Sequence, residues 1–357
     1  MSYTNGLDDP SAHFQIKTGV GASQPQSHTF DGNSDLQPDF LWWKRRDSSS
    51  NHWLHDSSRG ANKFLYANGT NGEGTDANQI TSFNTNGFST GSSWFDLGSQ
   101  TWVAWAWKAN GGTTSTDTNG SITSTVQVNQ DAGFSIVQYT GTGSTADQTI
   151  GHGLGVRANA VIVKNRDGAA NWVVYVDGLT ANHSMELNTL DTESDSTQGR
   201  VLSNAGTRGT STIFSIRSGS GSVIQTNTSG EDYVAYCFAE KQGYSKFSKY
   251  VGNGNVNGAF IYTGFKPAWV MIKRSDGVTN WRLFDNKRSG FNGDTSQLYP
   301  NLSNAEDAAG DQIDLLSNGF KNRTVSGDQN ISGASYIYMA FAENPFTTST
   351  GIPTTAR

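Results

Sequence analysis

Apolar and polar residues alternate along short segments of this chain, and one such pattern occurs three times. The stretches WVAWAW (102–107), YVAYCF (233–238) and YIYMAF (336–341) have the length and the aromatic or β-branched composition of β-strands. Alternate side chains of a strand share a face. One face carries only large apolar residues, and we expect it to be the inner face of a β-sandwich: Val103, Trp105, Trp107, Val234, Tyr236, Phe238, Ile337, Met339 and Phe341.

The opposite face of each stretch begins with an aromatic residue and ends with small residues. The aromatic residues are Trp102, Tyr233 and Tyr336. The simplest interpretation is a central core strand whose second face is covered by a loop. Two alternatives stay open: the three aromatic side chains form part of a shallow surface for a sugar ring, or they contact another subunit.

Three further markers recur in the same order around these stretches. A Gly-x-Gly turn comes first, and an apolar segment ending in a charged tip follows, as in FLWWKRRDSSSNHW (40–53), VIVKNRDGAANW (161–172) and WVMIKRSDGVTNW (269–281). A polar element of fixed spacing comes next. Internal repetition of this kind predicts a tandem array. We therefore expect three β-sandwich domains at residues 1–112 (copy 1), 121–243 (copy 2) and 244–346 (copy 3), a flexible linker at 113–120 and an exposed tail at 347–357.

Each charged tip has the pattern of a β-hairpin corner. In copy 2 two strand-like segments flank an Asp-Gly pair, and copy 1 is one residue longer between its tip and its tryptophan. The candidate binding residues are the tip residues and the tryptophans beside them: Arg46, Asp47, Arg166, Asp167, Arg274, Asp276, Trp53, Trp172 and Trp281. The alternative is that the charged residues hold the hairpins together.

The polar element offers the residues that calcium would use. Its candidates are Asn71 and Glu73, Asp191 and Glu193, and Asn304 and Glu306. Calcium takes six to eight oxygen ligands, however, and each copy supplies about three side chains. We therefore interpret the element as an Asx turn and expect no metal and no cofactor. His52 and His55 are interpreted as a surface pair, and Cys237 as a buried small residue.

Composition narrows the class of protein. Only 16% of the residues are charged, 41 are glycine and 11% are aromatic, which favours an all-β chain with many turns. The net charge of -6 offers no basic surface for nucleic acid. No apolar run reaches the length of a membrane span, and the start of the chain has no signal-peptide pattern. Paired carboxylates for a glycosidase are not excluded by counting, but polar residues that repeat favour a scaffold or a multivalent binder over a single catalytic site.

Several long phrases resemble a repeat family of marine bacteriophages. They include LDDPSAHFQ, FDGNSDLQPDFLWWKRRD, DAGFSIVQYTGTGSTADQTIGHGLG, EDYVAYCFAEKQGYSKF, YTGFKPAWVMIKR and the ending GIPTTAR. The resemblance covers nearly the whole chain. It implies a virion structural or tail-fibre protein, and it carries over no catalytic motif. By analogy of pattern alone, the module is also similar to jelly-roll or concanavalin-like sandwiches.

The sequence and the resemblance together suggest a non-enzymatic tail-fibre or tail-tip protein that contacts a host surface, with a glycan as the expected target. The expected partners are other virion proteins and further copies of the chain, with a trimer as one possible oligomer. The expected location is the virion, after assembly in the host cytoplasm. Two other functions stay open: a head decoration or other purely structural virion protein, and a polysaccharide depolymerase.

Overall fold

The three repeated stretches form the central strands of three sheets. The computed structural model describes residues 7–23, 25–92, 98–195, 201–202, 209–216, 225–288, 292–308 and 310–344. The chain is all-β, and every pair of neighbouring strands in its sheets is antiparallel. The predicted tail at 347–357 lies outside the described residues.

Copy 1 contributes a large sheet and a small sheet. The large sheet has the order β1-β9-β3-β4-β5-β6 and the small sheet the order β2-β8-β7. A short 3-10 turn, η1 (Pro10–Ala12), precedes them. The bounds are β1 (Phe14–Val20), β2 (Gln26–His28), β3 (Phe40–Arg45), β4 (His52–Asp56), β5 (Lys63–Tyr66), β6 (Gly74–Thr75), β7 (Ile80–Asn84), β8 (Gly87–Thr90) and β9 (Thr101–Trp107).

Copy 2 has the longest sheet. Its order is β10-β11-β12-β20-β14-β15-β16-β17, and the small sheet is β13-β19-β18. The bounds are β10 (Ser115–Asp117), β11 (Ser124–Asn129), β12 (Phe134–Thr140), β13 (Gln148–Gly151), β14 (Ala160–Asn165), β15 (Val173–Val176), β16 (His183–Glu186), β17 (Ser194–Asp195), β18 (Val201–Leu202), β19 (Ile213–Ile216) and β20 (Asp232–Phe238).

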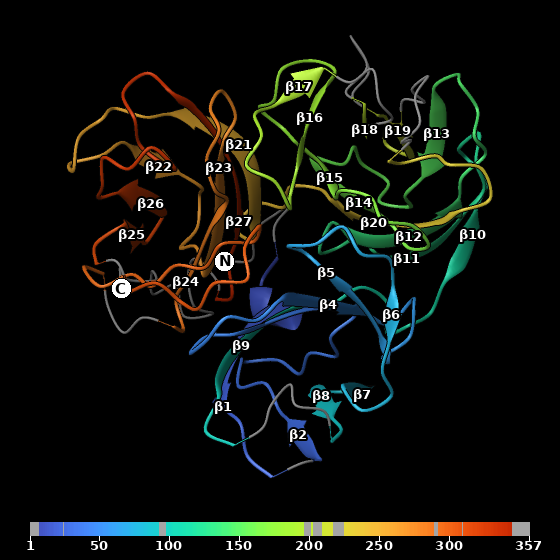
Figure 1. Ribbon diagram of the computed structural model, residues 1–357, viewed down its shortest axis with the longest axis horizontal. Coiled ribbons are helices and arrows are strands. Elements are labelled where there is room, and N and C mark those ends of the chain that lie inside the picture. Colours follow the sequence, from blue (N-terminus) through green and yellow to red (C-terminus); the bar gives the residue numbers. More distant parts are fainter. Residues whose placement is uncertain are drawn as a thin grey trace.

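Copy 3 repeats the arrangement with fewer strands. Its sheets have the orders β21-β27-β23-β24 and β22-β26-β25. The bounds are β21 (Ser245–Val251), β22 (Phe260–Tyr262), β23 (Trp269–Arg274), β24 (Arg282–Asp285), β25 (Ile313–Leu316), β26 (Gly319–Asn322) and β27 (Ser335–Phe341). Figure 1 shows copy 1 at the bottom, copy 2 at the upper right and copy 3 at the left, around a common centre.

The same register places equivalent side chains at equivalent points of the three sheets. Trp105 of β9 pairs with Ile16, Tyr236 of β20 with Ile136, and Met339 of β27 with Phe247. Each central strand has a second partner on its other side, β3, β14 or β23. The prediction that the three stretches are central core strands is therefore confirmed.

The prediction about which face is the sandwich interior is wrong. The face that begins with an aromatic residue packs on the small sheet of its own copy. In copy 1 Trp102 clusters with Ile80 and Phe88, and in copy 3 Tyr336 clusters with Ile313 and Phe320. A small sheet, and not a loop, therefore covers this face.

The face that carries Val103, Trp105 and Trp107 meets the other copies instead. Trp107 lies edge-on to Phe238 of copy 2 and to Trp269 and Phe341 of copy 3, with ring centroids 5.5–6.4 Å apart. One continuous apolar cluster contains residues from all three copies. Alternation alone could not distinguish the two faces, because both are apolar.

The segment predicted to be a flexible linker contributes a strand. Residues 113–120 contain β10, which pairs with β11 through the Ser115–Val126 and Asp117–Ser124 registers. The three strand residues are Ser, Thr and Asp, and they are exposed or only partly buried. The strand therefore shows no alternation of apolar and polar residues. The strand extends the copy 2 sheet at the edge where β21 is the last described strand of the copy 3 sheet.

We predict that a substitution in the shared apolar core destabilises all three copies together. Trp107→Ala removes a buried ring that contacts all three copies, and a large-to-small change of this kind costs about 3–5 kcal/mol. Urea unfolding followed by circular dichroism should show one transition at a lower midpoint. Val278→Ala is the control, because Val278 is exposed and such changes stay within about 0.5 kcal/mol. Three separate transitions, of which only one moves, would contradict a common core.

Candidate functional site

The charged tips of the three copies lie against the polar elements of neighbouring copies. Backbone N–H groups of Glu73, Glu193 and Glu306 donate to the carbonyls of Arg166, Ser275 and Arg46, at 2.6, 2.8 and 2.7 Å. The tip of copy 2 therefore contacts copy 1, the tip of copy 3 contacts copy 2, and the tip of copy 1 contacts copy 3. The three copies form a closed ring with three junctions.

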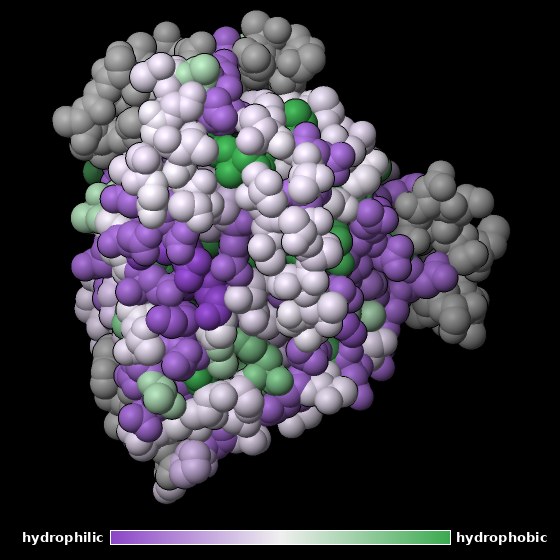
Figure 2. Space-filling view, turned by 90° about the vertical axis from the view of Figure 1, so that its right-hand side faces the viewer, coloured by the Kyte–Doolittle hydropathy of each residue, from purple (hydrophilic) through white to green (hydrophobic). Residues whose placement is uncertain are grey.

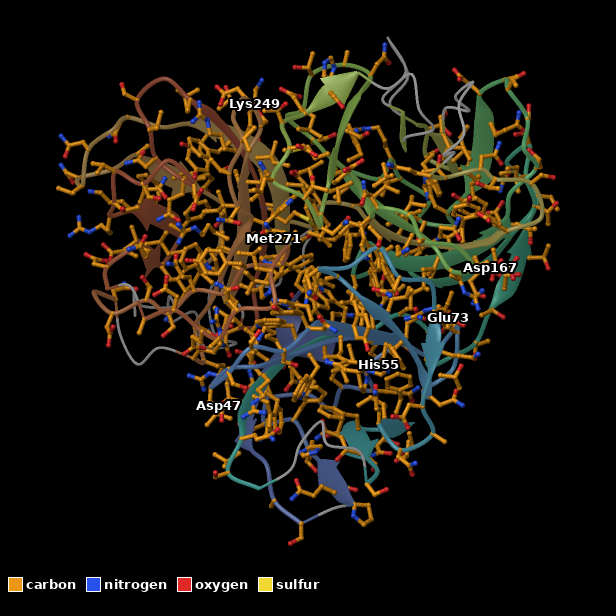
Figure 3. All side chains as sticks on the ribbon, viewed as in Figure 1. Asp47, His55, Glu73, Asp167, Lys249 and Met271 are labelled. Carbon is orange, nitrogen blue, oxygen red and sulfur yellow. The ribbon has the colours of Figure 1, made fainter. Side chains whose placement is uncertain are left out.

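The junction between copies 1 and 2 contains a buried cluster of charges. Glu73 accepts from the guanidinium of Arg166 at 3.0 Å and 3.2 Å, and from Arg59 at 3.1 Å. Arg59 is fully buried and also pairs with Asp56. Burial alone would raise the pKa of Glu73, but Arg166 and Arg59 outweigh it and lower that pKa. Figure 3 shows Glu73 and Asp167 close together at this junction.

The junction between copies 3 and 1 repeats this cluster. Glu306 accepts from Arg46 at 2.8 and 2.9 Å and from Arg288 at 3.0 Å. Arg288 pairs with Asp285, as Arg59 does with Asp56. Arg46 and Arg288 lower the pKa of Glu306 against the effect of burial. The first and third copies are therefore joined although they are far apart in sequence.

The junction between copies 2 and 3 has neither arginine. Ser275 stands where copies 1 and 2 have Arg46 and Arg166, and Thr180 stands where copies 1 and 3 have Arg59 and Arg288. Glu193 accepts instead from the N–H and hydroxyl of Thr180, at 2.6 and 3.1 Å. Both arginines are replaced together at this junction. Glu193 therefore binds neutral donors instead of guanidinium groups.

The tip aspartates fasten each hairpin to its own central strand. Backbone N–H groups of Thr101, Asp232 and Ser335 donate to the carboxylates of Asp47, Asp167 and Asp276. Arg274 pairs with Asp276 at 2.7 Å. These contacts match the alternative in which the charged residues hold the hairpins together, and Figure 3 shows Asp47 and Asp167 at well-separated places.

The tryptophans beside the tips also serve the junctions, with a change of register in copy 1. The indole N–H groups of Trp172 and Trp281 donate to the carbonyls of Tyr66 and Glu186 in the preceding copy, at 2.7 and 2.9 Å. The equivalent of both in copy 1 is His52, and not Trp53.

The hydrogen bonds of the polar element establish this register. The backbone N–H groups of His52, Trp172 and Trp281 donate to the side chains of Asn68, Asn188 and Asn301. Copy 1 is therefore no longer than the others between tip and ring. The sequence pattern matches Trp53 to Trp172 and Trp281 because Trp53 is the first tryptophan after the copy 1 tip, and this match is wrong by one residue. Trp53 packs in the core between the two sheets of copy 1.

None of the predicted aromatic contacts is available to a ligand. Trp53, Trp102, Trp172, Trp281, Tyr233 and Tyr336 are all buried. Tyr233 and Tyr336 also accept hydrogen bonds from the backbone N–H groups of Thr228 and Ile331. These residues therefore belong to the core and the junctions, and a sugar-stacking surface built from them does not exist.

The predicted surface pair of histidines is buried as well. His52 accepts a hydrogen bond from the indole of Trp42 at 2.9 Å. Burial lowers the pKa of both histidines, that of His55 to about 3. Both rings are therefore neutral at physiological pH. The sequence does not indicate their burial, because histidine is not typical of an interior strand.

The described part of the chain offers neither a metal site nor a membrane-spanning helix. No group of three His, Cys, Asp or Glu side chains there is placed to hold a metal ion. Of the calcium candidates, Glu73 and Glu306 bind arginines, and Asn71, Asp191 and Asn304 lie in the same turns at the junctions. No described helix is long and apolar enough to span a membrane. Cys237 is buried, which raises the pKa of its thiol.

Two buried contacts near the centre of the ring were not predicted. The phenol of Tyr236 donates to Asp56 at 2.7 Å, and the indole of Trp105 donates to Asp285 at 2.9 Å. Each aspartate lies three residues before its arginine, in the segments DSSR (56–59) and DNKR (285–288). That recurring spacing is the signal that could have identified them.

The surface carries shallow polar clefts. One of about 290 Å³ lies beside the copy 2 tip and is lined by Thr116, Thr125, Thr140, Arg166 and Asp232. Figure 2 shows the flank on the right of Figure 1, where hydrophobic residues occur only in small separate areas among polar ones. This flank therefore has the chemistry of a polar surface rather than of an extended apolar interface.

Three equivalent lysines lie beneath the tips. Lys44, Lys164 and Lys273 are buried, and Lys164 and Lys273 donate to the carbonyls of Thr70 and Leu190 in the preceding copy. Burial lowers the pKa of Lys44 and Lys164 to about 7 and that of Lys273 to about 8. Each junction therefore contains an amine that loses its proton more easily in the folded chain than in the unfolded chain.

We predict that Glu73→Gln destabilises the protein more than Glu193→Gln. The first change removes the carboxylate that pairs with Arg166 and leaves Arg59 with Asp56 alone, and breaking a buried pair costs about 3–5 kcal/mol. The second leaves only neutral donors, each worth about 1 kcal/mol. Free energies of unfolding from urea titrations measure both. Equal losses for the two variants would refute the assignment of the charge clusters.

We also predict that stability rises between pH 7 and pH 9. The unfolded chain, whose lysines have pKa values near 10.4, binds more protons in this range than the folded chain. Lys164→Met should reduce the slope by up to about 1.4 kcal/mol per pH unit, as measured by urea unfolding at pH 7, 8 and 9. Lys249→Met, at an exposed position, is the control. If Lys164→Met leaves the pH dependence of the free energy of unfolding unchanged, the buried lysine is not its cause.

Comparison with known proteins agrees with the extent of the repeat. No curated protein and no solved structure matches the chain. A family model described as a domain of unknown function, DUF7483, matches residues 9–345, which include all three copies. The chain therefore belongs to the DUF7483 family.

Proposed function

We propose that this protein is a non-enzymatic component of a bacteriophage virion, at the tail fibre or tail tip, where it contacts the host surface. The resemblance of its long sequence phrases to marine bacteriophage proteins supports the virion assignment. The observation that carries the non-enzymatic assignment is that the recurring charged residues are engaged with one another at the junctions. Repeated polar groups that join copies act as a scaffold.

We further propose that each copy is one β-sandwich of a tandem array. The large sheet and the small sheet of a copy share an apolar cluster, as Trp102 with Phe88 and Tyr336 with Phe320 do. This shared cluster supports a copy that holds its two sheets together as one body and presents its loops at the surface. Several weak contacts made by one body strengthen one another through high effective concentration.

The proposed partners are other virion proteins, further copies of the chain and a host glycan. A homo-oligomer, with a trimer as the expected form, would use surfaces other than the three junctions. Each junction is already occupied within one chain by Glu73, Glu193 or Glu306. The loops and the outer strand edges are the surfaces that stay accessible.

Labelling of intact particles tests this proposal. Antibodies raised against the purified protein, with gold conjugates, should label the distal tail of the virion in electron micrographs. Label over the head lattice would overturn the tail assignment in favour of a head decoration. Label nowhere on the particle would overturn the virion assignment altogether.

A hydrolysis assay tests the absence of enzymatic activity. The protein should release no reducing ends from capsular polysaccharide of a host strain that the particle infects. The matched positive control is a known depolymerase on the same substrate. Steady release of reducing ends would favour the depolymerase alternative, and a search of carboxylate variants would then locate the site.

A further inference from the structure

Copy 3 exposes two aromatic side chains on one face of a strand. Along β22 the burial alternates, so that Phe260 and Tyr262 point outward while Ile261 is buried. Phe260 is 46% exposed and Tyr262 is 64% exposed. Among the described residues they are the aromatic side chains with large exposed areas. Gly319 lies opposite Tyr262 on β26, and the ring of Phe260 lies beside it, since a Cβ atom there would be 2.9 Å from Cε2 of Phe260.

A polar cleft adjoins Tyr262. It has a volume of about 410 Å³ and lies between the turn that connects copies 2 and 3 and the end of β22. Its lining includes Glu240, Lys241, Gln242, Lys246, Tyr262 and Thr263. Lys246 pairs with Glu240 at 2.8 Å, and Glu240 also accepts from the N–H of Phe247. Lys241 and Gln242 line the same cleft, and Gln242 is exposed.

The same place in copy 2 is filled by the chain itself. The register of the small sheets makes Gly151 the equivalent of Tyr262. A Cβ atom on Gly151 would lie 2.2 Å from the carboxyl carbon of Asp117, so β10 covers this position. Gln130 also crosses the gap and donates to the carbonyl of Gly153 at 2.8 Å.

In the part of the chain that the structure describes, no strand equivalent to β10 lies beside the cleft of copy 3. The chain between β20 and β21 is a short turn, whereas copy 2 is preceded by a longer segment that contains β10 and β11. Tyr262 therefore stands where copy 2 has a glycine, and an open cleft lies where β10 covers copy 2. A site of this kind requires an occupant with one apolar face and a polar edge.

We propose that this cleft is a binding subsite for a pyranose unit of a polysaccharide. The C–H face of the sugar ring packs on Tyr262, as flat apolar surfaces do on aromatic rings. The ammonium of Lys241 and the amide of Gln242 provide hydrogen bonds for the hydroxyl groups at the edge of the sugar. The inference rests on the proposed contact with a host glycan and names the place where that contact is made.

Affinity electrophoresis through gels that contain dextran, mannan or alginate tests the subsite. The wild-type chain should be retarded by at least one of the three polysaccharides. Tyr262→Ala should weaken binding at least tenfold, and Tyr262→Phe, which keeps the ring, should stay within threefold of wild type. Val278→Ala, at an exposed position on the tip of copy 3, is the control. Circular dichroism of each variant excludes a folding defect.

The outcomes separate the subsite from the broader function. Retardation by none of the polysaccharides, or equal retardation of wild type and Tyr262→Ala, overturns the subsite. If gold label is then found on the distal tail, the proposed function stands without it. Binding that depends on Tyr262 together with label over the head lattice supports the subsite and overturns the tail assignment.

Discussion

A sheet that is apolar on both faces has to be covered twice, and this requirement organises the molecule. The central strands β9, β20 and β27 carry large side chains in both directions. A three-stranded sheet of the same copy covers one face. Only the other copies can cover the second face, which is why Trp107, Phe238 and Phe341 meet. A single copy on its own would leave that face in water, so the three copies depend on one another for burial.

The charged junctions determine which copies are neighbours. Apolar surfaces are not directional, whereas a glutamate between two arginines defines a specific neighbour. Glu73 and Glu306 each bind one arginine of their own copy and one of the next tip. Trp172 and Trp281 add a directed hydrogen bond from one copy to the preceding one. The last copy also reaches the first through Glu343, which accepts from the N–H of Ile16.

The repeat, the strand character of 102–107, 233–238 and 336–341, and the hairpin corners were predictable because alternation and turn chemistry are local signals. The partner of Glu306 was not, since Arg46 is 260 residues away. Periodicity could not tell the two apolar faces of Trp102 and Trp105 apart. The equivalence of His52 with Trp172 depends on a hydrogen bond to Asn68, which no spacing reveals. Polar strands such as β10 give no apolar pattern at all. The open cleft at Tyr262 likewise emerges only when the small sheets are compared.

The three junctions differ in chemistry, because the junction between copies 2 and 3 lacks the two arginines. Copy 1 is clasped by a carboxylate–guanidinium cluster on both of its sides, whereas copies 2 and 3 meet through Thr180 and Ser275. The pKa values of Glu73 and Glu306 lie below their usual range, so acidification through those values removes the negative charge of each glutamate and leaves its arginines without that partner. Acid therefore weakens the ion pairs that join copy 1 to its two neighbours, whereas Glu193 at the junction between copies 2 and 3 accepts from the neutral donors of Thr180. Because one apolar cluster contains residues of all three copies, weakening these two junctions lowers the stability of the whole chain rather than that of copy 1 alone.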